Sequence, residues 1–134
     1  MRVVIDTNIL VSATGWEGNA RELLRRASKG DFTVVISDEI LEEYLEVIRR
    51  DKFSFLDKKK VTRFVLLMLE FVEVLSVKSR VRAVREDPED DMVLSCAKAA
   101  GARLIVTGDS HLLKLGKWSG IRIVSPGEAL DLLD

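Results

Sequence analysis

Residues 2–6 read RVVID, a short run of mostly β-branched apolar residues that ends in an acid. A run of this length and composition is typical of a buried strand. Segments of the same character recur along the chain, separated by stretches whose apolar residues repeat at helical spacing. These further strand candidates are residues 32–36 (FTVVI), 73–77 (EVLSV), 103–107 (RLIVT) and 121–124 (IRIV).

The stretches between the strand candidates begin and end with residues that favour helix termini. Gly30 follows the first stretch as a C-cap, and Ser37 precedes the second as an N-cap. A proline at the first turn, after Asp87 and again after Ser125, marks the start of two later helices. The helices expected from these signals cover about residues 20–29, 37–50, 57–71, 87–101, 110–115 and 125–133.

Strands that alternate with helices predict a parallel sheet with helices on both faces. We therefore expect an α/β fold in three layers, in which about five parallel strands are flanked by helices. At this length, residues 1–134 are expected to form a single domain. Ligands of such sheets bind beyond the carboxyl ends of the strands, so a functional site is expected at that edge.

The composition limits the kind of metal site that this edge of the sheet can form. Cys96 is the only cysteine, which excludes an internal disulfide, and the single histidine, His111, cannot build a zinc site by itself. A bound metal would therefore sit among oxygen ligands. The first residues lack the pattern of a signal peptide, and no apolar run reaches the length of a membrane span. We therefore expect a cytoplasmic protein with no membrane partner.

Acidic residues stand where the edge of the sheet is expected. Asp6 ends the first strand and Asp109 follows the fourth, so both reach the carboxyl edge. A helical projection at about 100° per residue places Glu43 at the border of the apolar face of its helix. The neighbouring acids Glu42 and Glu46 lie on the polar side. Glu43 is therefore the acid of this helix best placed to be partly buried.

The helix that begins near Asp87 supplies a fourth acid. The same projection, at about 100° per residue, places Asp90 among apolar residues and turns Asp91 toward water. Asp87 lies on the side of Asp90, either as a helix cap only or as a supporting residue of the site. A carboxylate that points inward is costly unless a positive charge compensates it, and a metal ion would do so.

A divalent ion among these acids would give them a catalytic use. Hard cations prefer oxygen ligands, and a bound ion can activate water and stabilise a leaving alkoxide. Hydrolysis of a phosphodiester needs these functions and no nucleophilic side chain. Each acid alone also has an ordinary structural explanation, as a cap, a turn residue or the border of a helix face. The site is therefore predicted from the group, which is Asp6, Glu43, Asp90 and Asp109.

Four stretches of the chain, in order, resemble the motifs of the PIN-domain family, and most closely its small stand-alone VapC-like toxins. Residues 4–8 (VIDTN) resemble the first motif and residues 37–44 (SDEILEEY) the second. Residues 87–94 (DPEDDMVL) resemble the third and residues 107–113 (TGDSHLL) the fourth. The resemblance runs over essentially the whole chain.

The resemblance implies roles for individual residues and for ligands. It implies that the four acids, Asp6, Glu43, Asp90 and Asp109, bind metal and catalyse, with Asn8 and Thr107 as supporting residues. The third motif leaves Asp90 and Asp91 as alternatives, and its spacing favours Asp90. The family further implies Mg²⁺ or Mn²⁺ as cofactor, single-stranded RNA as the usual substrate, and frequent homodimers. Toxin members are held by an antitoxin protein that inserts a segment near the acids.

An acidic site repels RNA, so basic residues are expected around it. Arg50 lies beside Glu43 on the helical projection and is our candidate for RNA binding through a phosphate. The other cations considered, each of which is also explained as an ordinary solvated residue, are Arg21, Arg25, Lys29, Arg49, Lys52, Lys58, Lys59, Lys60, Arg63, Lys78, Arg80, Arg82 and Arg85.

Two other classes of α/β protein also carry acids at the edge of the sheet. A phospho-accepting receiver domain would carry a lysine after the fifth strand, where residues 123–126 read IVSP. A dehalogenase-type phosphatase would need a second acid where Asn8 stands. Two alternatives stay open. One is a catalytically weak PIN fold used as a scaffold or partner-binding module, and the other is a nuclease that acts on DNA.

Overall fold

The computed structural model describes residues 1–77 and 88–133. Its strands are β1 (Arg2–Ile5), β2 (Thr33–Ser37), β3 (Glu73–Leu75), β4 (Leu104–Val106), β5 (Lys117–Trp118) and β6 (Ile121–Val124). Its helices are α1 (Thr7–Gly15), α2 (Asn19–Ser28), α3 (Asp38–Ile48), the short 3₁₀ helix η1 (Asp51–Phe53), α4 (Lys58–Phe71), α5 (Pro88–Ala100), α6 (Ser110–Leu115) and α7 (Pro126–Leu133).

The strands form one six-stranded sheet in the order β3-β2-β1-β4-β6-β5. Strand β1 pairs in parallel with β2 on one side and β4 on the other, and β3 and β6 extend the parallel part outward. The side chains of Val3, Val4 and Ile5 are fully buried at the centre. All strands predicted from sequence are present, and they run in parallel as expected.

Strand β5 was not expected. It pairs antiparallel with β6 through a tight turn in which Ser119 and Gly120 have φ angles of 50° and 80°. A two-residue strand is too short to show any alternation of apolar and polar residues, so no sequence pattern announces it. The sheet therefore has one more strand, at its edge, than the predicted five.

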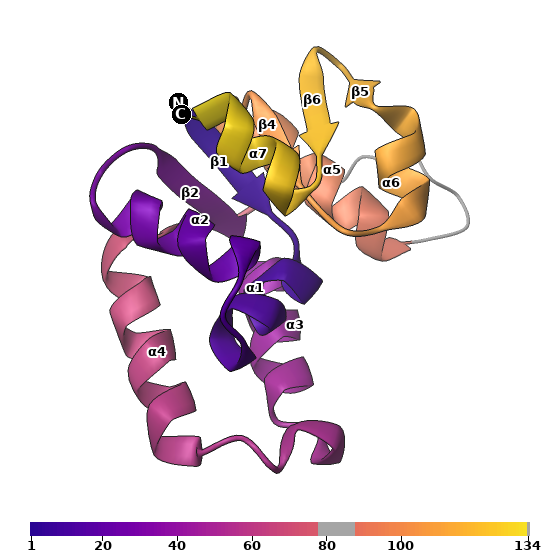
Figure 1. Cartoon of the computed structure of the whole chain (residues 1–134). Coiled ribbons are helices and arrows are strands. Elements are labelled where there is room, and N and C mark those ends of the chain that lie inside the picture. The colour runs from indigo at the N-terminus through magenta and orange to yellow at the C-terminus, as the bar shows by residue number, and fades with distance from the viewer. Residues whose placement is uncertain (78–87, 134) are drawn as a thin grey trace.

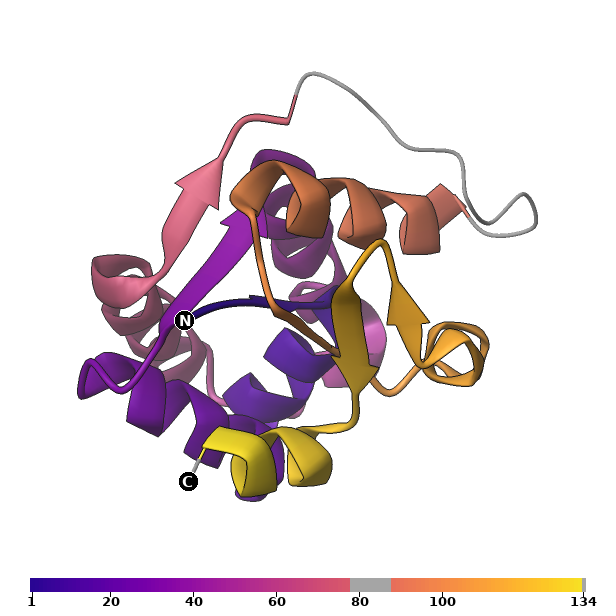
Figure 2. The same ribbon diagram turned by 90° about the horizontal axis from the view of Figure 1, so that it is seen from above.

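Helices cover both faces of the sheet, which gives the three layers predicted from the alternation of strands and helices. Helix α5 packs against β1, β2 and β4 on one face, while α2 contacts β2 and α7 contacts β4 on the other (Figure 2). Helix α4 stands beside α2 and reaches beyond the sheet (Figure 1). None of the helices in the described ranges is both long and apolar enough to span a membrane.

Helix α1 is the largest element that the sequence analysis missed. It begins directly after β1, and the Asp6 carboxylate caps it by accepting a hydrogen bond of 3.1 Å from the Ile9 N–H. Most of its residues are buried, so the helix has no polar stripe to set against an apolar one. Its sequence, TNILVSATG, therefore lacks the periodic pattern by which helices are recognised.

The cap predicted for α3 is present, and α4 begins at a similar side-chain cap. The Ser37 hydroxyl accepts a hydrogen bond of 3.1 Å from the Ile40 N–H at the start of α3. The Asp57 carboxylate accepts from Lys59 N–H and Lys60 N–H at the start of α4. These side chains accept hydrogen bonds from N–H groups of the first helical turn, which have no acceptor within the helix. Each helix therefore begins at these residues.

A buried hydrogen bond joins α1 to α3. The single hydroxyl hydrogen of Thr14 is donated to the Leu10 carbonyl, 2.8 Å away, so Tyr44 is the donor in its bond to the Thr14 hydroxyl. Burial raises the pKa of Tyr44 above its ordinary value of 10.0, which keeps the phenol protonated and able to donate. The bond fixes how α3 lies against the helix that follows the first strand.

Replacing Tyr44 with phenylalanine is expected to lower the free energy of unfolding by about 1 kcal/mol, because the buried Thr14 hydroxyl loses its donor. Urea denaturation followed by circular dichroism measures this change. A midpoint identical to that of the wild type would mean that the bond contributes nothing to stability.

Candidate metal centre at the carboxyl edge of the sheet

Asp6 is a buried carboxyl group at the point where β1 ends. Its side chain is 7% exposed. One oxygen, Oδ1, caps α1, and the other, Oδ2, accepts a short hydrogen bond from the Thr107 hydroxyl, across the sheet from β4. Burial raises the pKa of Asp6 above its ordinary value of 3.8, more than these hydrogen bonds lower it, and the nearby Asp109 raises it further. The ionised form is therefore disfavoured in the absence of a positive charge.

Thr107 connects Asp6 to a second acid. Its hydroxyl donates to Asp6 and accepts a hydrogen bond of 3.0 Å from the Asp109 N–H. Asp109 in turn caps α6, because its Oδ1 accepts from the N–H groups of His111 and Leu112 at 2.8 and 3.1 Å. The carboxylate of Asp109 is 30% exposed, so it faces the surface of the site while Asp6 lies at its base.

Asp90 comes to the same place from the first turn of α5. Its side chain is 4% exposed. One potential ligand atom from each of Asp90, Asp109 and His111 lies within 4.8 Å of the other two, the one such group of three or more acids, histidines or cysteines within residues 1–77 and 88–133. Asp90 and Asp109 are therefore brought together from parts of the chain that are distant in sequence, and Thr107 links the buried Asp6 to Asp109.

The prediction that Asp91 points toward water is wrong. Its side chain is 6% exposed, almost as little as that of Asp90. All eight residues from 90 to 97 are buried, so this stretch of α5 is covered on every side. A helical projection assumes one buried and one solvated face, and it fails for a helix enclosed in this way. Burial alone therefore does not distinguish Asp90 from Asp91, but only Asp90 belongs to the group with Asp109 and His111.

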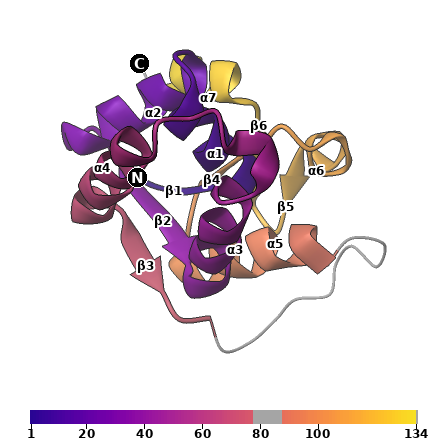
Figure 3. The same ribbon diagram turned by 90° about the horizontal axis from the view of Figure 1, so that it is seen from below.

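The other predicted site residues lie farther out or outside the described part. Glu43 is half-buried on α3, a helix that packs against both α1 and α5 (Figure 3). Asn8 is exposed in the first turn of α1, two residues after Asp6. Asp87 lies outside the described residues. Thr107 contacts both Asp6 and Asp109, and a hydrogen bond from the Asn8 backbone to Asp6 contributes to lowering the pKa of that acid.

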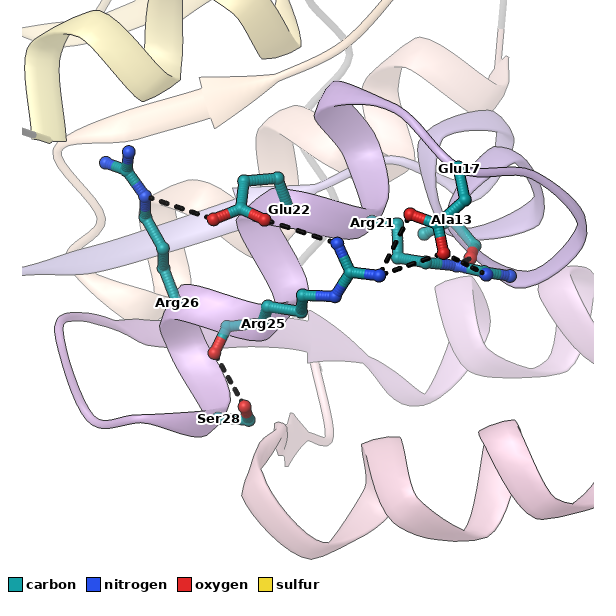
Figure 4. A network of polar contacts seen from close by, with 7 residues as sticks. All are labelled: Ala13, Glu17, Arg21, Glu22, Arg25, Arg26 and Ser28. Carbon is teal, nitrogen blue, oxygen red and sulfur yellow. Dashed lines mark hydrogen bonds and ion pairs between the residues drawn. The ribbon is translucent and has the colours of Figure 1, made fainter.

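The cations considered for RNA contacts include several that already form ion pairs with glutamate side chains. Arg50 is exposed, and its guanidinium forms an ion pair of 3.0 Å with Glu46, one helical turn earlier. Arg21 and Arg25 both hold Glu17, and Arg25 also contacts Glu22, as Figure 4 shows. The hydrogen bonds from these two arginines lower the pKa of the exposed Glu17 carboxyl. The candidates Lys78, Arg80, Arg82 and Arg85 lie outside the described residues.

A groove of about 890 Å³ lies between α2 and α4, away from these acids. Apolar side chains such as Leu24, Phe64 and Met68 line it, together with the cations Arg21 and Lys60. None of the four predicted acids contributes to its lining. The groove is therefore a separate surface and no part of the acidic cluster.

The cluster has the properties that a divalent cation requires. Carboxylate oxygens are the ligands that Mg²⁺ and Mn²⁺ prefer. Asp6 is deeply buried, yet no lysine or arginine of the described residues forms an ion pair with it, and its pKa is raised. A buried carboxylate of this kind needs a positive charge to remain ionised. Asp90 and Asp109, with Asp6 linked to Asp109 through Thr107, therefore form a donor set that fits a hard metal ion.

His111 belongs to this cluster, and the sequence analysis did not include it. A lone histidine was set aside because it cannot form a metal site without other ligands. Its position nonetheless indicated that it lies near the site. His111 follows Asp109 by two residues, in the first turn of a helix that begins at the carboxyl edge of the sheet. That edge is where ligands of parallel sheets bind.

The chain is similar to known proteins in both sequence and fold. A family profile described as PIN domain matches residues 2–111, which is most of the chain. No curated protein matches the sequence. Among solved structures, the chain is similar to the crystal structure of VapBC2 from Rickettsia felis bound to a DNA fragment from their promoter, with a TM-score of 0.65 and 19% identity. That similarity covers 92% of this chain and 97% of the other.

Proposed function

The chain belongs to the PIN-domain family, whose members are generally nucleases, and from this premise we propose that it is a Mg²⁺- or Mn²⁺-dependent endoribonuclease that cleaves single-stranded RNA. In this proposal residues 1–134 act as one PIN-like domain. The observation that carries it is the meeting of Asp90 and Asp109 at the carboxyl edge of the sheet, with the buried Asp6 linked to Asp109 through Thr107. Such convergence has no role in packing, because it gathers like charges in a partly buried place.

Asp6, Asp90 and Asp109 would hold the ion, and Glu43 would complete the site from α3. A bound divalent ion supplies an activated water and a positive charge at the leaving oxygen. In the hydrolysis, the oxygen of a water molecule would bond to phosphorus as that water loses a proton. The bond from phosphorus to the leaving oxygen would break, and the leaving oxygen would take up a proton. Thr107 would orient the Asp6 carboxylate through its hydroxyl, and Asn8 would support the site from the first turn of α1.

The RNA strand would reach the site across a surface that includes Arg50. This arginine is exposed at the end of α3, the helix that carries Glu43, and its ion pair with Glu46 is of the weak, solvent-accessible kind. A phosphate could therefore displace Glu46 at little cost. Cleavage of RNA and of DNA with one and the same sequence tests the preference for RNA, and equal cleavage of both would contradict it.

We also propose that the chain is the toxin of a toxin–antitoxin pair, cytoplasmic and homodimeric. The family and the likeness to a VapBC complex support a protein partner. The groove between α2 and α4 offers apolar surface beside cations, which suits a partner segment with apolar and acidic residues. Co-expression with the product of a short neighbouring gene should yield a complex that suppresses cleavage. A scaffold function would be favoured if the protein bound metal and partner but cut no RNA.

Replacing Thr107 with valine is expected to lower Mn²⁺ affinity by roughly 10- to 100-fold, the usual effect of losing a side chain that orients a metal ligand. Valine has the shape of threonine, but it can neither donate to Asp6 nor accept from the Asp109 N–H. Titration calorimetry measures the affinity. Thr107→Ser keeps the hydroxyl and serves as the control, which should bind Mn²⁺ nearly as well as the wild type. Equal loss in both variants would contradict the role given to the hydroxyl.

A further inference from the structure

We propose that His111 supplies an imidazole nitrogen ligand to the divalent ion, so that the centre is a mixed nitrogen and oxygen site. This inference rests on the proposed function, because it takes the ion to be bound by Asp90 and Asp109. It concerns this chain's own residue, one that the motifs of the sequence did not bring into the site.

The position of the imidazole supports direct ligation. A ligand atom of His111 lies within 4.8 Å of one on Asp90 and one on Asp109. Two ligands of the same ion, each about 2.1 Å from it, lie at most roughly 4.2 Å apart. The ligand atoms would therefore have to come closer together by a few tenths of an ångström. A small rotation of a side chain provides a movement of that size. The His111 side chain is 60% exposed, so surrounding atoms leave room for that rotation.

The backbone around His111 holds the ligands in place. The His111 N–H donates to Oδ1 of Asp109 at 2.8 Å, and the Leu112 N–H donates to the same oxygen at 3.1 Å. Because Oδ1 is committed to the helix cap, Oδ2 of Asp109 would be the oxygen that binds the ion. The Nδ1 atom of His111 stands 3.9 Å from Oδ1, too far for a hydrogen bond that would hold the ring there.

A nitrogen ligand would change which ions the centre prefers. Carboxylates and water suit Mg²⁺ and Mn²⁺, whereas imidazole favours ions such as Zn²⁺ and Ni²⁺ and binds Mg²⁺ poorly. The wild-type protein is therefore expected to bind Mn²⁺ more tightly than Mg²⁺, and His111→Asp should reduce this difference. Loss of the ring in His111→Ala should weaken Mn²⁺ binding by at least about tenfold.

The chain offers an unusually clear test, because His111 is its only histidine. Pulsed electron paramagnetic resonance of bound Mn²⁺ detects the ¹⁴N coupling of a coordinated imidazole. In protein without a histidine tag, any such signal must come from this residue. We expect the coupling in the wild type and in the control Lys114→Ala, an exposed residue of the same helix. It should be absent from His111→Ala and from His111→Asp.

The outcomes separate this inference from the function on which it rests. If Mn²⁺ binds stoichiometrically but shows no imidazole coupling, and His111→Ala binds it as tightly as the wild type, His111 is no ligand while the acidic site stands. If the wild type binds no Mn²⁺ at all by calorimetry, the metal centre itself fails and the ligation by His111 fails with it.

Discussion

Replacing Asp6 with asparagine is expected to abolish metal-dependent cleavage and, in the metal-free protein, to raise the melting temperature at neutral pH. The loss of activity should be at least about 100-fold, because a metal contributes several kcal/mol to the transition state and each 1.4 kcal/mol is tenfold in rate. The gain in stability arises because the buried Asp6 carboxylate is costly when no ion compensates it. Asparagine keeps an oxygen that can cap α1 at the Ile9 N–H.

The dependence of stability on pH identifies the Asp6 contribution. Its pKa is raised above 3.8 in the folded protein, chiefly by burial, so the folded state holds this proton more tightly than the unfolded state does. The free energy of unfolding supplied by this group is therefore greatest below about pH 3.8 and falls as the pH rises toward the raised pKa. Above the raised pKa, this loss in the free energy of unfolding no longer changes with pH. Asp6→Asn should lack this fall.

Bound metal should stabilise the wild type, which removes the disadvantage of its buried Asp6 carboxylate, and should not stabilise Asp6→Asn. At a free Mn²⁺ concentration of 100 times Kd, binding to the folded state adds about 2.7 kcal/mol to the stability. Thermal unfolding with EDTA and with Mn²⁺, for the wild type and Asp6→Asn, measures both effects together. An Asp6→Asn protein that is less stable than the metal-free wild type and still responds to Mn²⁺ would mean that Asp6 is a structural cap and nothing more.

Replacing Glu43 with glutamine is expected to reduce cleavage by roughly 100-fold or more, whereas Glu42→Gln should stay within about twofold of the wild type. The two acids are neighbours on α3, but Glu43 is half-buried and Glu42 is exposed. Glutamine has nearly the volume of glutamate and removes only the charge. Cleavage of a fluorescent single-stranded RNA under excess Mn²⁺ gives the comparison.

The pair also separates a local role from a general electrostatic one. If both substitutions reduced cleavage equally, the negative charge of α3 as a whole would matter and Glu43 would have no special position. If neither did, the site would consist of Asp6, Asp90 and Asp109 without a contribution from α3. Unchanged circular dichroism in both variants would exclude unfolding as the cause.

Much of the fold could be predicted because its signals are local. The strands appear as short β-branched runs, and the starts of α3 and α4 are set by Ser37 and Asp57, whose side chains bond to N–H groups two or three residues away. Helix α1 could not be predicted in this way, since burial on nearly all sides removes the periodic pattern. Asp6 was predicted as an acid of the metal site at the end of a strand, and its second role as the cap of this helix was missed.

The composition of the site was harder to predict than its location. The topology rule for parallel sheets led to Asp6 and Asp109, because it needs only the order of strands and helices. The prediction that Asp91 points toward water was wrong, because the depth to which α5 is buried depends on the rest of the fold. The proximity of His111 to Asp90 depends on tertiary packing that no spacing rule reports, whereas the pairing of Arg50 with Glu46 follows the ordinary four-residue spacing of ion pairs on a helix and was overlooked.

Mn²⁺ binding and RNA cleavage, measured together on the wild type and on Asp90→Asn, test the central claim most directly. Asp90 is buried at the meeting point of the cluster, so its loss should remove the ion and the activity at once. We predict that the wild type binds Mn²⁺ by calorimetry and cuts a fluorescent single-stranded RNA until EDTA is added, and that Asp90→Asn does neither. A wild type that neither binds metal nor cuts, or an Asp90→Asn variant that does both, would contradict the account.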